Sequence, residues 1–174
     1  MTGVEHTRAG RVREVNMGIH TAAIVLAVLL GGPADRTSPQ AATDSIEEAI
    51  LAVSDEMTRA GESLDADRLF SFIRDNDKGA IIENGVLFTT KQEALERVKA
   101  NLAGAASVRY RWKRRLVTVL APDLALLTAE GESTATAGDG RTFTVPFAQT
   151  VVFSRKADGW KAVHAHQSAQ RPAR

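Results

Sequence analysis

The feature that most constrains this chain is a series of four long segments in its second half, rich in apolar, β-branched and aromatic residues. The segments cover residues 107–120, 124–136, 142–156 and 160–168, and the turns between them contain Pro122-Asp123, Gly138-Asp139-Gly140 and Asp158-Gly159. Such turn residues between β-rich runs are typical of hairpins. We therefore expect four consecutive antiparallel strands, followed by a flexible tail over residues 169–174.

Before these strands the chain shows helical spacing and one further hairpin signal. Apolar residues recur every three or four positions after Ser45, which predicts a first helix there, and a shorter helix is expected from about Asp65. Asn84-Gly85 predicts a tight turn between two short strands, and Thr90 is placed to cap a third helix. Helices that precede an antiparallel meander must cover one face of its sheet, so the pattern predicts an α+β fold with a strongly curved sheet.

The amino-terminal residues 1–34 have the pattern of an export signal. The basic part holds Arg8, Arg11 and Arg13, the apolar run covers residues 22–30, and small residues follow. This order is that of a signal peptide, and the run is shorter than the roughly 20 residues that a membrane-spanning helix needs. We expect cleavage after Ala34 and a linker over residues 35–44, whether translation starts at Met1 or Met17. An uncleaved N-terminal anchor is the alternative that this pattern leaves open.

The composition excludes several kinds of site. The chain has no cysteine, which excludes disulfide bonds, thiolate metal ligands and a cysteine nucleophile. Its formal net charge of +1 gives no reason to expect nucleic acid as a partner. We therefore expect an exported protein that depends on a packed core, with no metal site, no cofactor, no nucleic-acid partner and no membrane contact after signal cleavage.

With these elements, residues 45–168 resemble the NTF2-like superfamily, and more narrowly its SnoaL-like bacterial branch of small pocket proteins. The resemblance rests on the two-helix opening, on the Gly138-Asp139-Gly140 hairpin and on the closing stretch TVVFSRKADGWKAVHAHQS over residues 150–168. It implies an NTF2-like (cystatin-like) cone, in which the N-terminal helices pack on a strongly curved antiparallel sheet around a pocket. It also implies a small-molecule ligand and a homodimer formed through the sheet.

Members of this superfamily include ketosteroid isomerases, polyketide cyclases, dehydratases and non-catalytic binding or dimerisation modules, because one fold hosts many functions. The isomerase chemistry needs an aspartate base that faces a tyrosine and a protonated aspartate. This chain has one tyrosine, Tyr110, and no aspartate that its sequence places opposite. The resemblance therefore implies the fold and carries over no catalytic set.

His164 and His166 are the first candidate site residues. They lie two positions apart on the last predicted strand, so we expect them on the same face, about 7 Å apart. Such a pair can bind a polar ligand, transfer a proton or supply two metal ligands, although a metal needs a third ligand. We favour ordinary pocket lining or hydrogen bonding over catalysis, and catalysis over metal binding.

Three further residues are predicted to bind a ligand. Gln149 interrupts an alternating apolar face, where it must hydrogen-bond a ligand, one of the two histidines or, as a structural alternative, the backbone at a bulge. Tyr110 and Trp112 share a face of the first long strand, which we expect to face the cavity or core.

Basic and acidic residues of the first two long strands are expected on the other face. The basic residues alternate with the aromatics: Arg109, Arg111, Lys113 and Arg115. Arg114 falls on the aromatic face, which predicts either a bulge in this strand or an anionic ligand. Glu130 and Glu132 are expected at a solvated edge or in ion pairs with the neighbouring basic strand, ahead of a role as a pocket base.

Together these features predict an exported homodimer that binds a small molecule through Tyr110, Trp112, Gln149, His164 and His166. A second hypothesis is an enzyme of isomerase, cyclase or dehydratase type that uses His164 or His166 as acid and base. A third is a protein–protein interaction module. We favour the non-catalytic binding protein.

Overall fold

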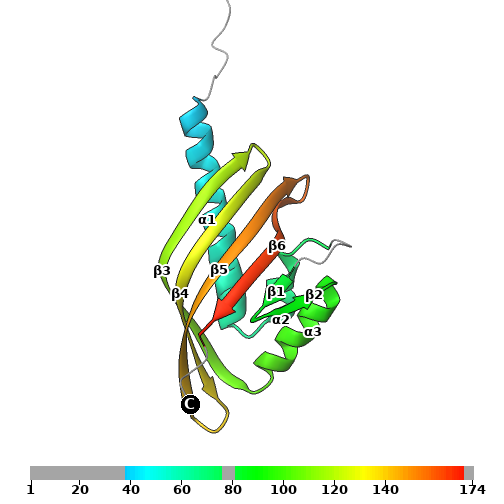
Figure 1. Cartoon of the computed structure of the whole chain (residues 1–174), viewed down its shortest axis with the longest axis vertical. Coiled ribbons are helices and arrows are strands. Elements are labelled where there is room, and N and C mark those ends of the chain that lie inside the picture. Colours follow the sequence, from blue (N-terminus) through cyan, green and yellow to red (C-terminus); the bar gives the residue numbers. More distant parts are fainter. Residues whose placement is uncertain (1–37, 76–80, 171–174) are drawn as a thin grey trace, which may run out of the picture. The chain divides into compact units, whose positions relative to one another are not determined.

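The computed structural model describes residues 38–75 and 81–170 (Figure 1). The predicted signal peptide, the first residues of the predicted linker and the end of the predicted tail lie outside the described residues. No helix among the described residues is long and apolar enough to cross a membrane.

Three helices precede the long strands: α1 (Pro39–Glu62), α2 (Ala66–Ser71) and α3 (Lys91–Leu102). Helix α1 begins earlier than predicted, inside the expected linker, because the Ser38 side chain accepts a hydrogen bond from the Ala41 amide and Pro39 occupies the first turn. Asp65 and Thr90 cap α2 and α3 as predicted.

Six strands form one sheet in the order β2-β1-β6-β5-β4-β3: β1 (Ile81–Glu83), β2 (Val86–Phe88), β3 (Ala105–Ala121), β4 (Leu124–Ala137), β5 (Thr142–Lys156) and β6 (Gly159–Ala169). Neighbours are antiparallel except β1 and β6, which run parallel. The four predicted long strands are confirmed to within two residues at each end. The predicted Asn84-Gly85 hairpin is also confirmed, with φ angles of 50° and 84° at its two residues.

The helices lie on one face of the curved sheet, so the predicted α+β plan is confirmed (Figure 1). Ile50 of α1 and Phe70 of α2 pack there against Leu127, Val151 and Phe153 of the sheet. Several sheet positions in this core are alanine, which leaves room for the helices to approach: Ala125, Ala129 and Ala162.

Gly131 of β4 lies at a closely packed point of the same face. It pairs with Trp112 on one side and Phe147 on the other. A Cβ atom at this position would lie 2.7 Å from the carbonyl oxygen of Arg111 and 3.3 Å from the Phe147 ring. The backbone oxygen cannot move without distorting the strand, so only glycine fits here.

Replacing this glycine is expected to destabilise the protein. Gly131→Ala should lower the free energy of unfolding by about 1–3 kcal/mol, because the added methyl group overpacks the sheet. Gly138→Ala is the matched control, since nothing lies within 4 Å of its Cβ position, and it should change stability by less than about 0.5 kcal/mol. Urea denaturation of both variants measures the difference, and equal stabilities would show that the packing at Gly131 is looser than described.

Candidate ligand-binding site

The side chains that face the helices can be followed across the sheet, because directly paired residues of antiparallel strands project on the same side. Val151 and Phe153 are buried in the core and therefore identify this side. Two further rows of paired residues lie on this side: Trp112, Gly131 and Phe147 in one, and Ala129, Gln149 and Gln167 in the other. The helix-facing side therefore carries both aromatic and amide side chains.

Tyr110, Trp112 and Phe147 form an aromatic cluster on this side. The rings of Tyr110 and Trp112 stack with centroids 6.5 Å apart, and Phe147 meets them edge-on at 6.0 and 5.3 Å. Trp112 donates a hydrogen bond from Nε1 to Oγ1 of Thr58 on α1, at 3.2 Å. The cluster is held between sheet and helix, in agreement with the expectation that Tyr110 and Trp112 share a face.

A bulge in β3 changes the faces of the basic residues. The register shifts between Trp112 and Arg114, so Arg114 pairs with Glu130 and donates to its carboxylate at 3.0 Å. The predicted bulge is therefore confirmed. Arg115, expected on the basic face, instead lies towards α1, where it forms an ion pair with Asp55. That expectation was wrong because the bulge reverses the alternation of side chains beyond it.

The predicted ion pairs of the acidic residues in β4 are confirmed. Glu130 pairs with Arg114, and Glu132 pairs with both Arg111 and Lys113. These contacts lie on the face opposite to the aromatic cluster.

A second bulge, in β6, decides the position of the two histidines. Val152 pairs with His164, but Phe153 pairs with Ala162, so β6 contains one more residue than β5 between these pairs. Ala162 and Ala165 consequently both contact the core, while His164 and His166 lie on the other face. The five side chains predicted to line one pocket are thus divided between the two faces of the sheet. Tyr110, Trp112 and Gln149 lie towards the helices.

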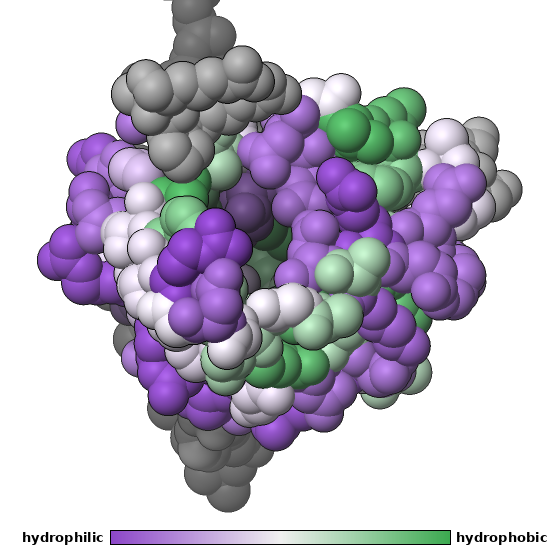
Figure 2. All heavy atoms as spheres, turned by 90° about the horizontal axis from the view of Figure 1, so that it is seen from below, coloured by the Kyte–Doolittle hydropathy of each residue, from purple (hydrophilic) through white to green (hydrophobic). Residues whose placement is uncertain are grey.

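A groove of about 550 Å³ lies beyond the core on the helix-facing side. Its walls come from the β1–β2 turn, from β4 and β5, and from the end of β6: Glu83, Asn84, Gly85, Ser133, Val145, Phe147, Gln167, Ser168, Ala169 and Gln170. Figure 2, which views the molecule from below, shows a hollow with hydrophobic surface inside it and a mostly hydrophilic rim. The groove thus combines apolar surface from Val145, Phe147 and Ala169 with several polar side chains.

The hydroxyl group of Tyr110 lies in a shielded, acidic environment. Burial raises its pKa above the ordinary value of 10.0, and the negative charges of Glu62 and Glu83 raise it further. Glu62 also accepts a hydrogen bond from the Tyr110 backbone amide at 2.9 Å. Two carboxylates from separate elements, the end of α1 and the end of β1, therefore act on one phenol.

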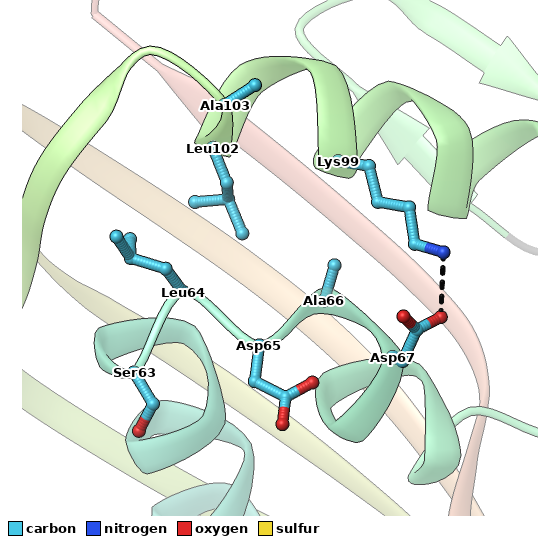
Figure 3. Close-up of a pocket in the computed structure, with 8 residues that line it drawn as sticks. All are labelled: Ser63, Leu64, Asp65, Ala66, Asp67, Lys99, Leu102 and Ala103. Atoms are coloured by element: carbon cyan, nitrogen blue, oxygen red, sulfur yellow. Dashed lines mark ion pairs between the residues drawn. The ribbon is translucent and has the colours of Figure 1, made fainter.

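A smaller recess of about 390 Å³ lies between the α1–α2 connection and the end of α3. Leu64 and Leu102 point into it, and the ion pair between Lys99 and Asp67 bridges α3 and α2 at 2.8 Å (Figure 3). Asp65 is already used as the cap of α2. Because its charged groups bind one another or the backbone, this recess offers less to a polar ligand than the groove does.

Three residues of this region were not predicted from the sequence: Glu62, Glu83 and Gln167. Glu83 directly precedes the Asn84-Gly85 turn, but its approach to Tyr110 depends on the parallel pairing of β1 with β6. Gln167 belongs to the helix-facing side only because of the bulge in β6. Among the described residues, no three histidine or carboxylate side chains come together as a metal site would require.

The single tyrosine of the chain makes its environment measurable, because the ultraviolet absorbance of the phenolate reports its ionisation. We expect Tyr110 to titrate above 10.0 and Glu83→Gln to lower this pKa, since a neutral amide no longer opposes the phenolate. Glu130→Gln, on the opposite face, is the control and should leave the pKa unchanged. A pKa at or below 10.0 in the unaltered protein would contradict the described environment.

Comparison with known proteins agrees with this architecture. A family model described as a SnoaL-like domain matches residues 50–172. A comparison with curated proteins gives no match.

Three solved structures show the likeness of fold. A Streptomyces avermitilis protein of the NTF2-like family, named as a dehydratase, has 19% identity and a TM-score of 0.67 over 74% of this chain and 99% of its own. A Novosphingobium aromaticivorans protein named as a scytalone dehydratase has 7% identity and a TM-score of 0.68 over 76% and 89%. An Erwinia carotovora protein named as ketosteroid isomerase-like has 19% identity and a TM-score of 0.59 over 72% and 96%. At these identities the solved structures show only the likeness of fold. The family model, which matches residues 50–172, shows the family to which the chain belongs. The chain belongs to the SnoaL-like domain family, within the NTF2-like superfamily.

Proposed function

We propose that this protein binds a small molecule in the groove on the helix-facing side of its sheet. The observation that carries the proposal is the composition of that groove, in which Phe147 and Val145 supply apolar surface and Glu83 and Gln167 supply polar groups. Within the described residues, the side-chain amide of Gln167 forms no hydrogen bond, so it is available to a ligand in the groove. Its volume of about 550 Å³ falls in the range of small-molecule pockets.

The proposal includes export and pairing of two copies. The basic, apolar and small-residue segments up to Ala34 support export. The sheet face turned away from the helices supports a dimer, because it exposes Leu116 and carries Thr150, Val152 and His164 side by side on β5 and β6. An exposed sheet face of this kind is suited to packing against its own copy.

An acid–base enzyme is the second candidate function. Proteins named as dehydratases and as ketosteroid isomerase-like share the fold. The observation that favours catalysis is the placement of the Tyr110 phenol near Glu62 and Glu83, since a shielded phenol and a carboxylate can act as acid and base. The histidine-based version of this hypothesis would use the opposite face of the sheet, away from the groove.

Native mass spectrometry of the full chain, produced in a bacterial host and recovered after export, tests the proposal. We expect a dimer of chains that begin at Asp35, carrying a small molecule that leaves on denaturation. Gln167→Leu should lose this ligand, because it removes an amide that lines the groove while keeping a side chain of similar size. Thr150→Val, on the other face of the sheet and paired with His166, is the control and should retain the ligand.

These mass spectra test signal cleavage, dimerisation and ligand binding separately. Chains that still contain residues 1–34 would contradict cleavage, and a monomer would contradict the dimer. A ligand lost from Thr150→Val but kept by Gln167→Leu would move the site to the histidine face. A protein that carries no ligand and binds none in a small-molecule screen would contradict the binding function.

A further inference from the structure

The described residues that line the groove carry one negative charge and no positive charge. Glu83 is the only charged side chain among the described residues that line it, and the other polar groups there are amides and hydroxyls. Amide and hydroxyl groups can donate or accept hydrogen bonds, whereas a carboxylate only accepts them. The wall of the groove therefore favours a ligand that donates hydrogen bonds and disfavours one with a negative charge.

Glu83 has no positive partner in the part of the chain that the structure describes. It forms no ion pair there, and neither does Glu62, whose carboxylate accepts a bond from the Tyr110 amide. The basic residues of β3 and of the β4–β5 turn are engaged elsewhere: Arg109 with the carbonyl of Val108, Arg111 and Lys113 with Glu132, Arg114 with Glu130, Arg115 with Asp55, and Arg141 with Asp139. The negative charge beside the groove is therefore not neutralised by these residues.

Aromatic surface lies next to this carboxylate. Phe147 lines the groove and belongs to the cluster with Tyr110 and Trp112. Tyr110 is close enough to Glu83 for the carboxylate to oppose its ionisation. Aromatic rings attract cations through their faces and provide apolar contact for a hydrocarbon body. An uncompensated carboxylate and an aromatic cluster thus occur together at one groove.

We infer that the ligand of this groove is an organic cation, an amine attached to an apolar or aromatic body. The amine would donate hydrogen bonds to the carboxylate of Glu83 and to the side-chain oxygen of Gln167, and its body would lie against Phe147. The inference rests on the proposed binding function and names the chemical class that the site selects. An isosteric carboxylate would bring two negative charges together in a partly shielded groove.

Three probes that share a 2-phenylethyl group and differ in the charge of the group attached to it test this inference on the full chain: phenethylamine, 2-phenylethanol and 3-phenylpropionate. Isothermal titration calorimetry should give the amine an affinity about tenfold or more above that of the alcohol, with the carboxylate weakest. Glu83→Gln should lower the amine's affinity to that of the alcohol and leave the alcohol unchanged. Glu130→Gln, which removes a carboxylate from the opposite face, should change neither.

A second variant distinguishes the loss of the Glu83 charge from a change in the structure of the groove. Glu83→Lys should reverse the preference, so that the carboxylate binds more tightly than the amine, and circular dichroism checks that each variant is folded. Equal binding of alcohol and amine, or an amine affinity that Glu83→Gln leaves unchanged, would overturn the cation inference while the binding function stands. Binding of none of the three probes would also overturn it, and the native mass spectra decide the binding function separately.

Discussion

Two of the irregularities in the strand register, the shift after Trp112 in β3 and the shift in β6, determine which of the candidate side chains this sheet presents to the helices. Without the shift between Val152 and Phe153, the alternation along β6 would place His164 and His166 towards the core. With it, Ala165 and Gln167 take those positions. The shift after Trp112 likewise turns Arg114 outwards and Arg115 towards α1. A bulge of one residue therefore moves the side chains beyond it to the opposite face of the sheet.

The groove follows from this arrangement and from the packing beside it. Gly131 allows Trp112 and Phe147 to meet above β4, and Phe147 is the member of their cluster with Tyr110 that lines the groove. The β1–β2 hairpin then adds Glu83 from the edge of β6, because β1 runs parallel to that strand. Residues distant in the sequence thus produce a site with apolar, amide and acidic parts, which suits a small ligand better than the exposed opposite face does.

Much of the fold could be predicted from local sequence, and the site only in part. Turn residues such as Asn84-Gly85 act through their own backbone preferences, so the strand ends were predicted to within two residues. The shared face of Tyr110 and Trp112 precedes the bulge in β3 and was therefore also predicted. The bulge in β6 falls in a run without glycine or proline, which carries no local signal of it. The approach of Glu83 to Tyr110 depends on pairing between distant strands, which a single sequence does not encode locally.

Gln167, and not a histidine, faces the helices beside Gln149. Nuclear Overhauser contacts between the side chains of β5 and β6 test it directly, because paired side chains on one face lie about 5 Å apart. The described register predicts contacts of Val151 with Ala165, Gln149 with Gln167 and Thr150 with His166. Contacts of Val151 with His164 and of Gln149 with His166 would instead show an unbroken alternation, and would return the histidines to the groove.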